Sequence, residues 1–359
     1  MSGEGIHILM VTPGFADGEN DSTCIPPLYL FVKELKKQQP GIKISIITLH
    51  YPFKKEKYSF SGAQVYPLNG RNRSWIFSSW MLHLRFRSVV SKIHKEFPVS
   101  VVHSFWLDQS AYFASRFAKE NNISHICTLM GQDATRDGFY GKMAVMINKN
   151  TTLIALSAFH RKMAEEVRKI KINRVIPWGV DDLTPENLQR EVDILGTGSL
   201  VEVKHYDRFI DIASSVRLVN KKIKVVVIGK GKQEEELQKK MDINKANIDF
   251  EYVGELSRSE VLHYMNRSKV FLHTARYESF GYVLAEALAM GCHVVSTPVG
   301  YACDNPEICT FSSNEEAVKL CVELLNTAIP EKRNFPVMKD VAERYMDLYV
   351  KQKGSSHGL

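Results

Sequence analysis

The chain carries, at residues 276–291, the stretch RYESFGYVLAEALAMG, which holds two glutamates eight positions apart around a Ser-Phe-Gly turn. Glu278 follows the apolar run VFLH (270–273), a predicted strand, and Glu286 falls two turns into a helix predicted from about Gly281 to Met290. Because a helix rises 1.5 Å per residue, the two carboxylates stand about 12 Å apart along its axis. They are therefore predicted to reach different parts of one ligand.

The turn between the strand and the helix is a predicted anion-binding site. The first amides of a helix have no intrahelical acceptor, and anions bind to them. These amides belong to Ser279, Phe280 and Gly281, and the glycine allows a ligand to approach the backbone closely. Two acids beside a phosphate-binding turn fit a nucleoside diphosphate bonded to a sugar. Both acids also fit ordinary solvated positions, although Glu286 lies in the apolar run VLAEALAM, where an unpartnered carboxylate is costly.

Short apolar runs alternate with helix-length segments in both halves of the chain. Continuous apolar character is typical of parallel strands that helices cover on both faces. In the first half, helices are predicted at about Pro27–Gln38, Trp75–Glu96, Ser110–Asn121 and Ser157–Val167. A polar stretch with two prolines, residues 177–193, separates the halves. We therefore predict an α/β fold with two doubly wound, Rossmann-like domains, residues 1–180 and 181–337, and a ligand site in the cleft between them.

Several segments together resemble a known family. Glu278-Ser279-Phe280-Gly281 with Glu286, followed by the strand HVVSTPVG (293–300), resembles the E-x7-E signature of the family 4 (group 1) retaining glycosyltransferases. The segment DILGTGSLVEVKHYDRFIDIAS (193–214) is similar to the first strand, loop and helix of the family's donor domain, with Lys204 at its phosphate-binding lysine. The segments KVVVIGKGKQEEEL, FEYVGELSRSEVLHYM and VIPWGVD also stand where the family has them. The resemblance implies the GT-B fold, with a last helix, 338–352, that crosses back to the N-terminal domain.

The resemblance also implies a reaction and a role for each candidate residue. The enzyme would move a hexose or N-acetylhexosamine from a UDP- or GDP-sugar to a glycan or lipid-linked acceptor, with retention, in surface polysaccharide or glycoconjugate synthesis. Lys204 and the turn amides would stabilise the departing diphosphate, although a solvated loop lysine is the alternative. Glu286 would bind the ribose hydroxyls and Glu278 the donor sugar. Because no D-x-D sequence occurs, we predict no metal and no cofactor besides the nucleotide-sugar co-substrate.

Three positions in the N-terminal half resemble acceptor-side or phosphate-loop elements of the family. His103 is predicted in the loop after the strand VSVVH, either to orient the acceptor or as a buried strand-end histidine. Asp133, after the strand ISHICTL, is predicted to make a polar contact across the cleft, or to cap a turn. Gly14 opens the loop PGFADGENDSTCIPP (13–27), where the family often has two adjacent glycines.

The pattern departs from the family at other positions as well. Ser199 replaces the usual diphosphate-binding arginine, Met130 a histidine and Trp178 an asparagine. The lost cation would weaken diphosphate binding unless Lys230, Lys232 or Arg276 compensates for it. A non-catalytic GT-B protein that binds a nucleotide sugar or a partner is therefore the alternative function.

A third interpretation is a dehydrogenase on a dinucleotide-binding fold. It rests on Gly229-Lys230-Gly231 after the run KVVVIG. Glu234 occupies the place of the third glycine, so the fingerprint is incomplete.

Composition and charge indicate the compartment and the partners. The 359 residues are enough for two cores, and residues 1–190 carry a net charge of +9 against −2 for the rest. Residues 71–88, RNRSWIFSSWMLHLRFRS, are predicted either to rest on an anionic membrane or to form a core helix with the stripe Leu82, Phe86, Val89, Val90, Ile93 and Phe97.

No other segment combines basic and aromatic residues into a platform on which nucleic acid could stack. With six unpaired cysteines, no signal peptide and no spanning segment, we predict a cytoplasmic protein, which is peripheral at the inner membrane surface if residues 71–88 rest on the membrane.

Overall fold

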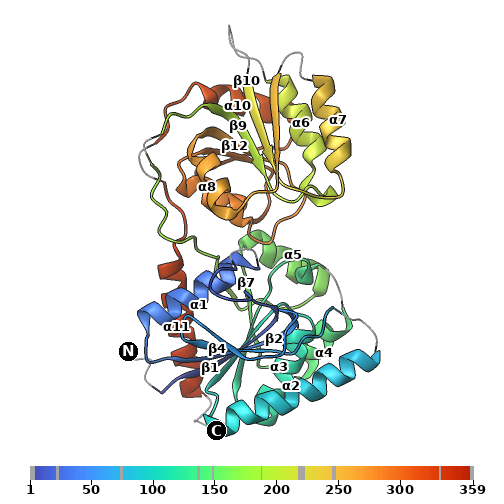
Figure 1. Cartoon of the computed structure of the whole chain (residues 1–359), viewed down its shortest axis with the longest axis vertical. Coiled ribbons are helices and arrows are strands. Elements are labelled where there is room, and N and C mark those ends of the chain that lie inside the picture. The colour runs from blue at the N-terminus through green and yellow to red at the C-terminus, as the bar shows by residue number, and fades with distance from the viewer. Residues whose placement is uncertain are drawn as a thin grey trace. The chain divides into compact units, whose positions relative to one another are not determined.

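The protein is described here by a computed structural model that covers residues 5–21, 24–72, 76–135, 138–147, 149–186, 188–216, 223–244, 248–330 and 333–355. The chain divides into two compact units. The first unit comprises Met1–Leu156, His160–Trp178 and Met338–Leu359, and the second comprises Ser157–Phe159 and Gly179–Val337. Each unit is a twisted sheet with helices packed against it (Figure 1).

The described part of the first unit contains one sheet of eight strands in the order β3-β4-β2-β1-β5-β6-β7-β8. Neighbouring strands run parallel except for β3 and β4, which form an antiparallel edge. The strands are β1 (His7–Gly14), β2 (Lys43–Tyr51), β3 (Tyr58–Phe60), β4 (Ala63–Pro67), β5 (Val101–Phe105), β6 (Ser124–Thr128), β7 (Thr152–Ala155) and β8 (Arg174–Val175). The helices are α1 (Pro26–Gln38), α2 (Ile76–Glu96), α3 (Gln109–Glu120), α4 (Phe139–Ile147), α5 (Ala158–Arg168) and α11 (Met338–Ser355), with a 3-10 turn, η1 (Gln132–Ala134).

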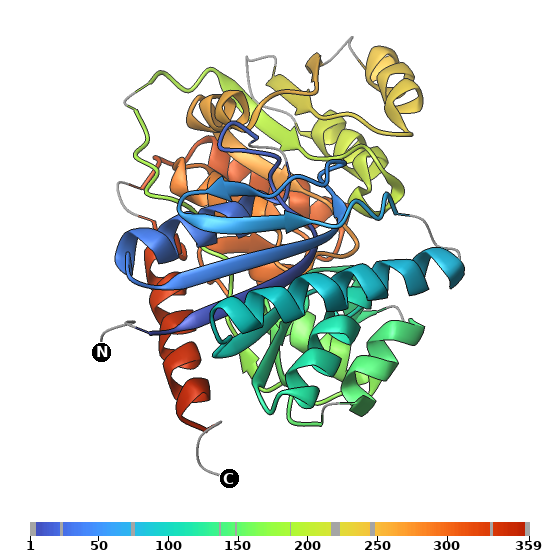
Figure 2. The same ribbon diagram turned by 60° about the horizontal axis from the view of Figure 1, so that its bottom comes forward.

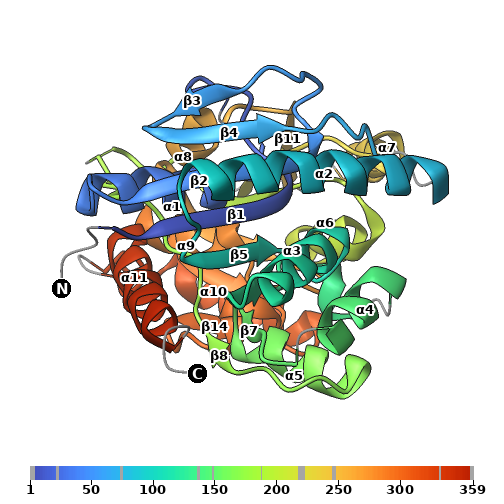
Figure 3. The same ribbon diagram turned by 90° about the horizontal axis from the view of Figure 1, so that it is seen from below.

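Helices cover both faces of this sheet, as its continuous apolar strands require. Leu82, Phe86 and Val90 of α2 pack with α3 onto β1 and β2 in one apolar core, and Figure 3 shows the two helices on the same side of the sheet. The chain returns from the second unit as α11, which lies beside α1 (Figure 2). The rings of Phe31 on α1 and Tyr345 on α11 are 4.9 Å apart.

The second unit repeats the architecture with a sheet of six described strands in the order β11-β10-β9-β12-β13-β14, all parallel. These are β9 (Val192–Thr197), β10 (Ile223–Ile228), β11 (Ile248–Gly254), β12 (Ser268–His273), β13 (His293–Ser296) and β14 (Ile308–Thr310). The helices are α6 (Tyr206–Ser215), α7 (Glu234–Asn244), α8 (Arg258–Asn266), α9 (Tyr282–Ala289) and α10 (Asn314–Leu325), with 3-10 turns η2 (Glu202–Lys204) and η3 (Gly300–Cys303). Helices α6, α7 and α10 pack on β9, β10 and β12 through one apolar core.

The predicted α/β class and the two Rossmann-like domains are confirmed. The helix predicted between Gly281 and Met290 is α9, which these two residues cap. The four helices predicted in the first half correspond to α1, α2, α3 and α5, each within a residue or so of its predicted ends. The strand order of the second unit brings the carboxyl ends of β9, β10, β12 and β13 to one edge, where ligands bind in open α/β sheets.

Candidate functional site

The loops that follow β9 and β10 cross each other closely. Leu200 N donates to Lys230 O over 3.0 Å. Gly229 has φ 144°, and a Cβ there would lie 1.9 Å from the carbonyl oxygen of Gly198. A Cβ at Gly231 would lie 2.1 Å from Leu200 O. Both glycines are thus required by backbone packing, which explains the pair without the dinucleotide-binding interpretation.

Lys204, Glu278 and His273 form a charged cluster at this edge of the second sheet. Lys204 ends η2, the first element after β9, and Glu278 lies in the loop between β12 and α9. The Lys204 ammonium forms an ion pair with Glu278 Oε1. His273, the last residue of β12, has its Nε2 3.1 Å from the same oxygen and its Nδ1 3.0 Å from Ser296 Oγ. Residues 74 positions apart in the chain therefore meet at one carboxylate.

The carboxyl group of Glu278 is buried, with 13% of its side chain exposed. Burial by itself would raise the pKa of this group. The charge of Lys204 and the hydrogen bond with His273 outweigh burial and lower the pKa of Glu278 to about 2. Glu278 is therefore ionised at neutral pH and can accept hydrogen bonds from hydroxyl groups, but it carries no proton to donate.

The predicted phosphate-binding turn lies beside this cluster. Gly281 is the N-cap of α9 in the left-handed conformation, with φ 78°. The ring of Phe280 is buried, and its carbonyl oxygen accepts a 2.7 Å hydrogen bond from Tyr301 N. A Cβ at Gly300 would lie 2.5 Å from the same oxygen, so the backbone of η3 packs directly on the turn. The chain therefore enters α9 in a fixed conformation. The amides of the first turn of this helix can bind an anion.

Glu286 lies one turn after Tyr282 on α9, with 9% of its side chain exposed. It is not isolated, because Arg258 Nε at the start of α8 donates to its Oε1 over 2.6 Å. The same guanidinium donates to both carboxylate oxygens of Asp181, over 2.6 and 3.2 Å. Burial raises the pKa of Glu286, Arg258 opposes this shift, and Asp181 adds to it.

The second unit thus brings together most of the residues predicted to bind the donor. Lys204 and Glu278 are in contact at the turn formed by Ser279, Phe280 and Gly281, and Glu286 lies in the second turn of α9. Sequence reasoning missed three partners: His273, Arg258 and Asp181. The signal for His273 was present, because it ends the apolar strand VFLH at the carboxyl edge. Arg258 lies in a polar segment without periodicity and carried no comparable signal.

The cations considered as substitutes for an arginine at Ser199 lie at the surface. Arg276 has 56% of its side chain exposed, 3.6 Å from Glu202, and its Nη2 lies 3.0 Å from His205 Nε2. Lys230 is exposed in the loop after β10. Compensation for the missing arginine remains a prediction.

The structure corrects the predicted position of His103. It does not lie in the loop after a strand but in the middle of β5, where it is fully buried. Its Nδ1 is 2.7 Å from Tyr349 Oη and its Nε2 is 2.8 Å from Thr128 Oγ1. Burial holds the pKa of His103 well below its usual value. This geometry matches the alternative of a buried, hydrogen-bonded histidine, here one that fastens α11 to the sheet.

Asp133, in η1, uses its carboxylate to organise the loop after β6. It accepts hydrogen bonds from the amides of Leu107, over 2.9 Å, Gly131, over 2.6 Å, and Met130, over 3.1 Å. These hydrogen bonds match the alternative in which Asp133 caps a turn. A contact of Asp133 across the cleft stays a prediction. Asp108, nearby in the loop after β5, has its pKa raised to about 7, mainly by burial.

Two other N-terminal positions have structural roles in the first unit. Gly14 ends β1, is buried, and would place a Cβ 3.5 Å from Tyr51 and 3.6 Å from the Cys24 sulfur. Trp178, at the family's asparagine position, is buried among the rings of Phe31 and Tyr345. The tryptophan that replaces the family's asparagine is thus a core residue of the first unit.

The predicted core stripe of α2 is confirmed for Leu82, Phe86, Val90 and Ile93, with Val89 half-buried beside them. Phe97, beyond the helix, is 38% exposed.

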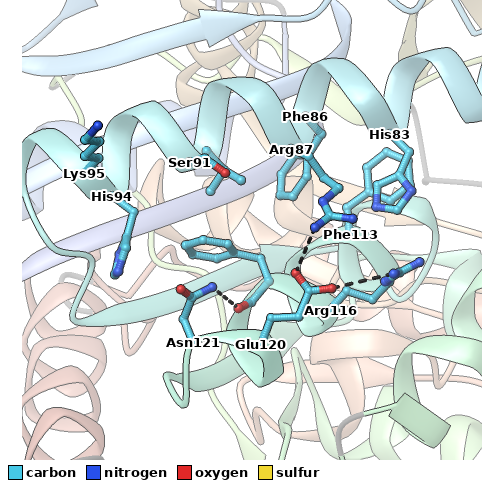
Figure 4. Close-up of a pocket in the computed structure, with 12 residues that line it drawn as sticks. His83, Phe86, Arg87, Ser91, His94, Lys95, Phe113, Arg116, Glu120 and Asn121 are labelled. Atoms are coloured by element: carbon cyan, nitrogen blue, oxygen red, sulfur yellow. Dashed lines mark hydrogen bonds and ion pairs between the residues drawn. The ribbon is translucent and has the colours of Figure 1, made fainter.

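A pocket of about 490 Å³ lies between α2 and α3, with Phe86, Phe113 and Phe117 in its lining. Figure 4 shows Arg87 and Arg116 both directed at Glu120, at 3.7 and 3.6 Å. Residues 73–75 of the predicted membrane segment lie outside the described residues.

Three properties of the described residues bear on other classes of site. No helix there is both long and apolar enough to cross a bilayer. No group of three or more histidine, cysteine, aspartate or glutamate side chains in these ranges has the arrangement of a metal site. All six cysteines are free thiols.

Comparison with solved structures defines the class of fold. Sucrose-phosphate synthase from Thermosynechococcus elongatus superposes with a TM-score of 0.73 at 14% identity, over 98% of this chain and 100% of that protein. The chain therefore has the GT-B fold of glycosyltransferases. Residues 185–305 match the family model described as "Glycosyl transferases group 1". The second unit accordingly contains a group 1 glycosyltransferase domain, and it is the unit in which Lys204, Glu278 and Glu286 converge.

Two curated proteins are similar to the chain in sequence, and both are subunits of a phosphatidylinositol N-acetylglucosaminyltransferase. The human protein is 25% identical over 282 residues, which are 72% of this chain and 56% of that protein. The gpi3 protein of Schizosaccharomyces pombe is 29% identical over 97 residues, 27% of this chain and 21% of that protein. The matches thus span about half and about a fifth of the length of these relatives.

Proposed function

We propose that the protein is a retaining, metal-independent glycosyltransferase of family 4. It moves a hexose or N-acetylhexosamine from a UDP- or GDP-sugar to a glycan or lipid-linked acceptor. The observation that carries this proposal is the contact of Lys204 with Glu278 beside the N-terminus of α9, with Glu286 in the second turn of the same helix. We assign Lys204 to the diphosphate, Glu278 to the sugar and Glu286 to the ribose of one donor.

The leaving diphosphate would bind to Lys204 and to the first amides of α9. The negative charge that develops on the diphosphate would be stabilised by the Lys204 ammonium and by the backbone dipoles of α9, which are oriented before the reaction. In the ligand-free protein Lys204 is neutralised by Glu278. A diphosphate would draw the ammonium towards itself and leave Glu278 to the sugar.

Glu278 would orient the donor sugar through its hydroxyl groups. Its low pKa makes it a hydrogen-bond acceptor at neutral pH and also a weak base. The proton of the acceptor hydroxyl would therefore pass not to Glu278 but to an oxygen of the leaving phosphate on the same face of the sugar. Bond breaking and bond formation on one face retain the anomeric configuration.

The two relatives favour one of the possible donor sugars and one of the possible classes of acceptor. Both are named as components of a phosphatidylinositol N-acetylglucosaminyltransferase. We accordingly propose N-acetylglucosamine as the first donor sugar to test and an anionic lipid as the first acceptor. The net charge of +9 on residues 1–190 suits such an acceptor at a membrane surface.

Helix α2 is the proposed contact with the membrane. Its core face packs on the sheet, while Trp80 and Leu84 remain 55% and 43% exposed. Arg85 and Arg87 are exposed on the same helix. Exposed apolar side chains next to cations suit the headgroup region of an anionic leaflet. We place the protein in the cytoplasm, peripheral at the inner membrane surface, as part of this proposal.

A second candidate function is a GT-B protein that binds a nucleotide sugar without turnover. Ser199 supplies no second cation beside Lys204, and the ammonium of Lys204 is paired with Glu278. Such a protein would bind donors but release neither nucleotide nor transferred sugar.

One experiment separates the two candidates. The purified full chain is screened by thermal shift against UDP- and GDP-linked sugars, because a ligand of the native state raises the melting temperature. Donors that bind are then incubated with vesicles with and without phosphatidylinositol, and products are identified by mass spectrometry. We expect a stabilising donor and a glycosylated lipid. Binding with neither transfer nor hydrolysis supports the second candidate, and no binding of any nucleotide or nucleotide sugar contradicts both.

A further inference from the structure

Arg258 joins two carboxylates that are far apart in the sequence. It is the first residue of α8, directly after the N-cap Ser257, whose side chain forms a capping box with Glu260. From this fixed position its Nε donates to Glu286 Oε1 and its two terminal nitrogens donate to Asp181. Only 17% of its side chain is exposed. The guanidinium is therefore held at three points, which is a rigid arrangement for an arginine.

Glu286 needs such a partner because α9 is otherwise apolar there. Leu284, Ala285, Ala287 and Leu288 are buried on either side of it. A buried carboxylate loses its hydration and tends to take up a proton unless a cation or hydrogen bonds hold it ionised. Arg258 supplies both the charge and a hydrogen bond.

We propose that Arg258 is a positioning residue of the nucleotide site, which keeps Glu286 ionised and turned so that its carboxylate can accept the ribose hydroxyls. The inference rests on the proposed function, because it concerns the same donor. Arg258 engages Oε1, and a carboxylate has about four lone-pair directions, so ribose binding does not require the ion pair to break.

An arginine suits this role better than a lysine. The planar guanidinium presents its donors in a fixed fork, and here one edge faces Asp181 while Nε faces Glu286. The guanidinium carbon also lies 5.9 Å from the centre of the Tyr282 ring. A lysine would supply one charge at one point and leave the direction of the Glu286 carboxylate unfixed.

The charged and titratable groups around Glu286 set the expected pH dependence. They are Arg258 from α8, Asp181 from the segment before β9, and Tyr282 from its own helix, whose hydroxyl donates to Gly179 O. Without Arg258, burial and the negative charge of Asp181 both act to raise the pKa of Glu286. The protonated acid is a poorer acceptor, so nucleotide affinity would fall at low pH and recover as pH rises.

The test is a calorimetric titration of wild type, Arg258→Met and Arg258→Lys with UDP and GDP from about pH 6 to about pH 9. For the preferred nucleotide we expect Arg258→Met to bind about tenfold more weakly near neutral pH and to approach wild type at high pH. Arg258→Lys should recover part of the loss. Arg267→Met, at the C-cap of the same helix and paired with Glu191, is the matched control and should bind like wild type.

A double-mutant cycle with Glu286→Gln distinguishes positioning from general support of the fold. If Arg258 acts through Glu286, adding Arg258→Met to Glu286→Gln changes the Kd little. Thermal unfolding of each variant confirms that the second unit is folded. The inference is overturned if folded Arg258→Met binds like wild type at every pH, or if its loss of affinity does not depend on pH and persists in full beside Glu286→Gln. A wild type that binds no nucleotide would instead contradict the proposed function.

Discussion

The ammonium of Lys204 and the carboxylate of Glu278 form an ion pair at the carboxyl ends of β9 and β12, beside the N-terminus of α9. Each group is therefore held in place by the other before a ligand arrives. We propose that a bound diphosphate takes the Lys204 ammonium and leaves the Glu278 carboxylate to the sugar. The two residues are therefore separable by experiment, because one should act on the diphosphate and the other on the sugar.

Replacement of Lys204 by methionine should weaken UDP binding about tenfold, because a charged hydrogen bond to the diphosphate is lost. Binding of uridine, which has no phosphate, should stay unchanged. Both affinities are measured by calorimetry, with Lys240→Met as the control, since Lys240 pairs with Asp211 on neighbouring helices. Equal losses for UDP and uridine would show that Lys204 only supports the fold.

Removal of metal ions should leave the transfer rate unchanged. The charge on the leaving diphosphate is assigned to Lys204 and to helix amides, so no divalent cation is needed. The rate is measured before and after dialysis against EDTA, then with added Mn²⁺ or Mg²⁺. An enzyme that EDTA inactivates and Mn²⁺ restores would rule out this part of the mechanism.

Asp108 should make the first unit less stable at high pH. Burial raises the pKa of its carboxyl group to about 7, the Ser110 amide opposes this, and Asp133 adds to it. A raised carboxyl pKa favours the protonated, folded form, so this stability is present below the unfolded pKa near 4 and is lost as pH rises through about 7.

The corresponding variant is Asp108→Asn, which keeps an N-cap side chain for α3. It should be more stable than wild type by about 2 kcal/mol near pH 8, and the difference should shrink towards pH 5. Thermal unfolding at both pH values measures this. The same difference at both pH values would mean that ionisation of Asp108 is not responsible.

The double change Trp80→Ser and Leu84→Ser should reduce binding to anionic vesicles about thirtyfold or more, because each exposed side chain offers apolar area worth about 1–2 kcal/mol. Flotation at low salt, with and without anionic lipid, measures the bound fraction. Ile243→Ser is the control, since this residue is 82% exposed on α7 of the second unit. If wild type does not float at low salt, the membrane proposal is excluded.

The sequence was most informative where local patterns coincide with the fold. Continuous apolar runs such as KVVVIG and VFLH predicted buried parallel strands, and α9 was predicted between the two residues that cap it. The helix α4 and the short strands β3 and β8 were not predicted, because two or three residues carry no periodicity and α4 follows an irregular loop. Lys204 and Glu278 were predicted for one donor site because the segments 193–214 and 276–291 both resemble the glycosyltransferase family.

The remainder of the site depends on contacts between distant segments. Arg258 lies 28 positions from Glu286 and 77 from Asp181, so no local pattern reveals their ion pairs. His103 was placed beyond its strand because a polar residue at the end of an apolar run resembles a loop position. In the structure, Tyr349 from the opposite end of the chain supplies its partner, which makes a buried position possible.

The most direct test of the central claim is the transfer rate of Glu278→Gln, measured beside its affinity for UDP. The amide keeps the shape of the side chain but loses the charge that orients the donor, so transfer should slow about a hundredfold. Affinity for UDP should change little, because we assign nucleotide binding to Lys204, the helix amides and Glu286. Equal transfer rates for the variant and the wild type would contradict the role of Glu278 in the reaction.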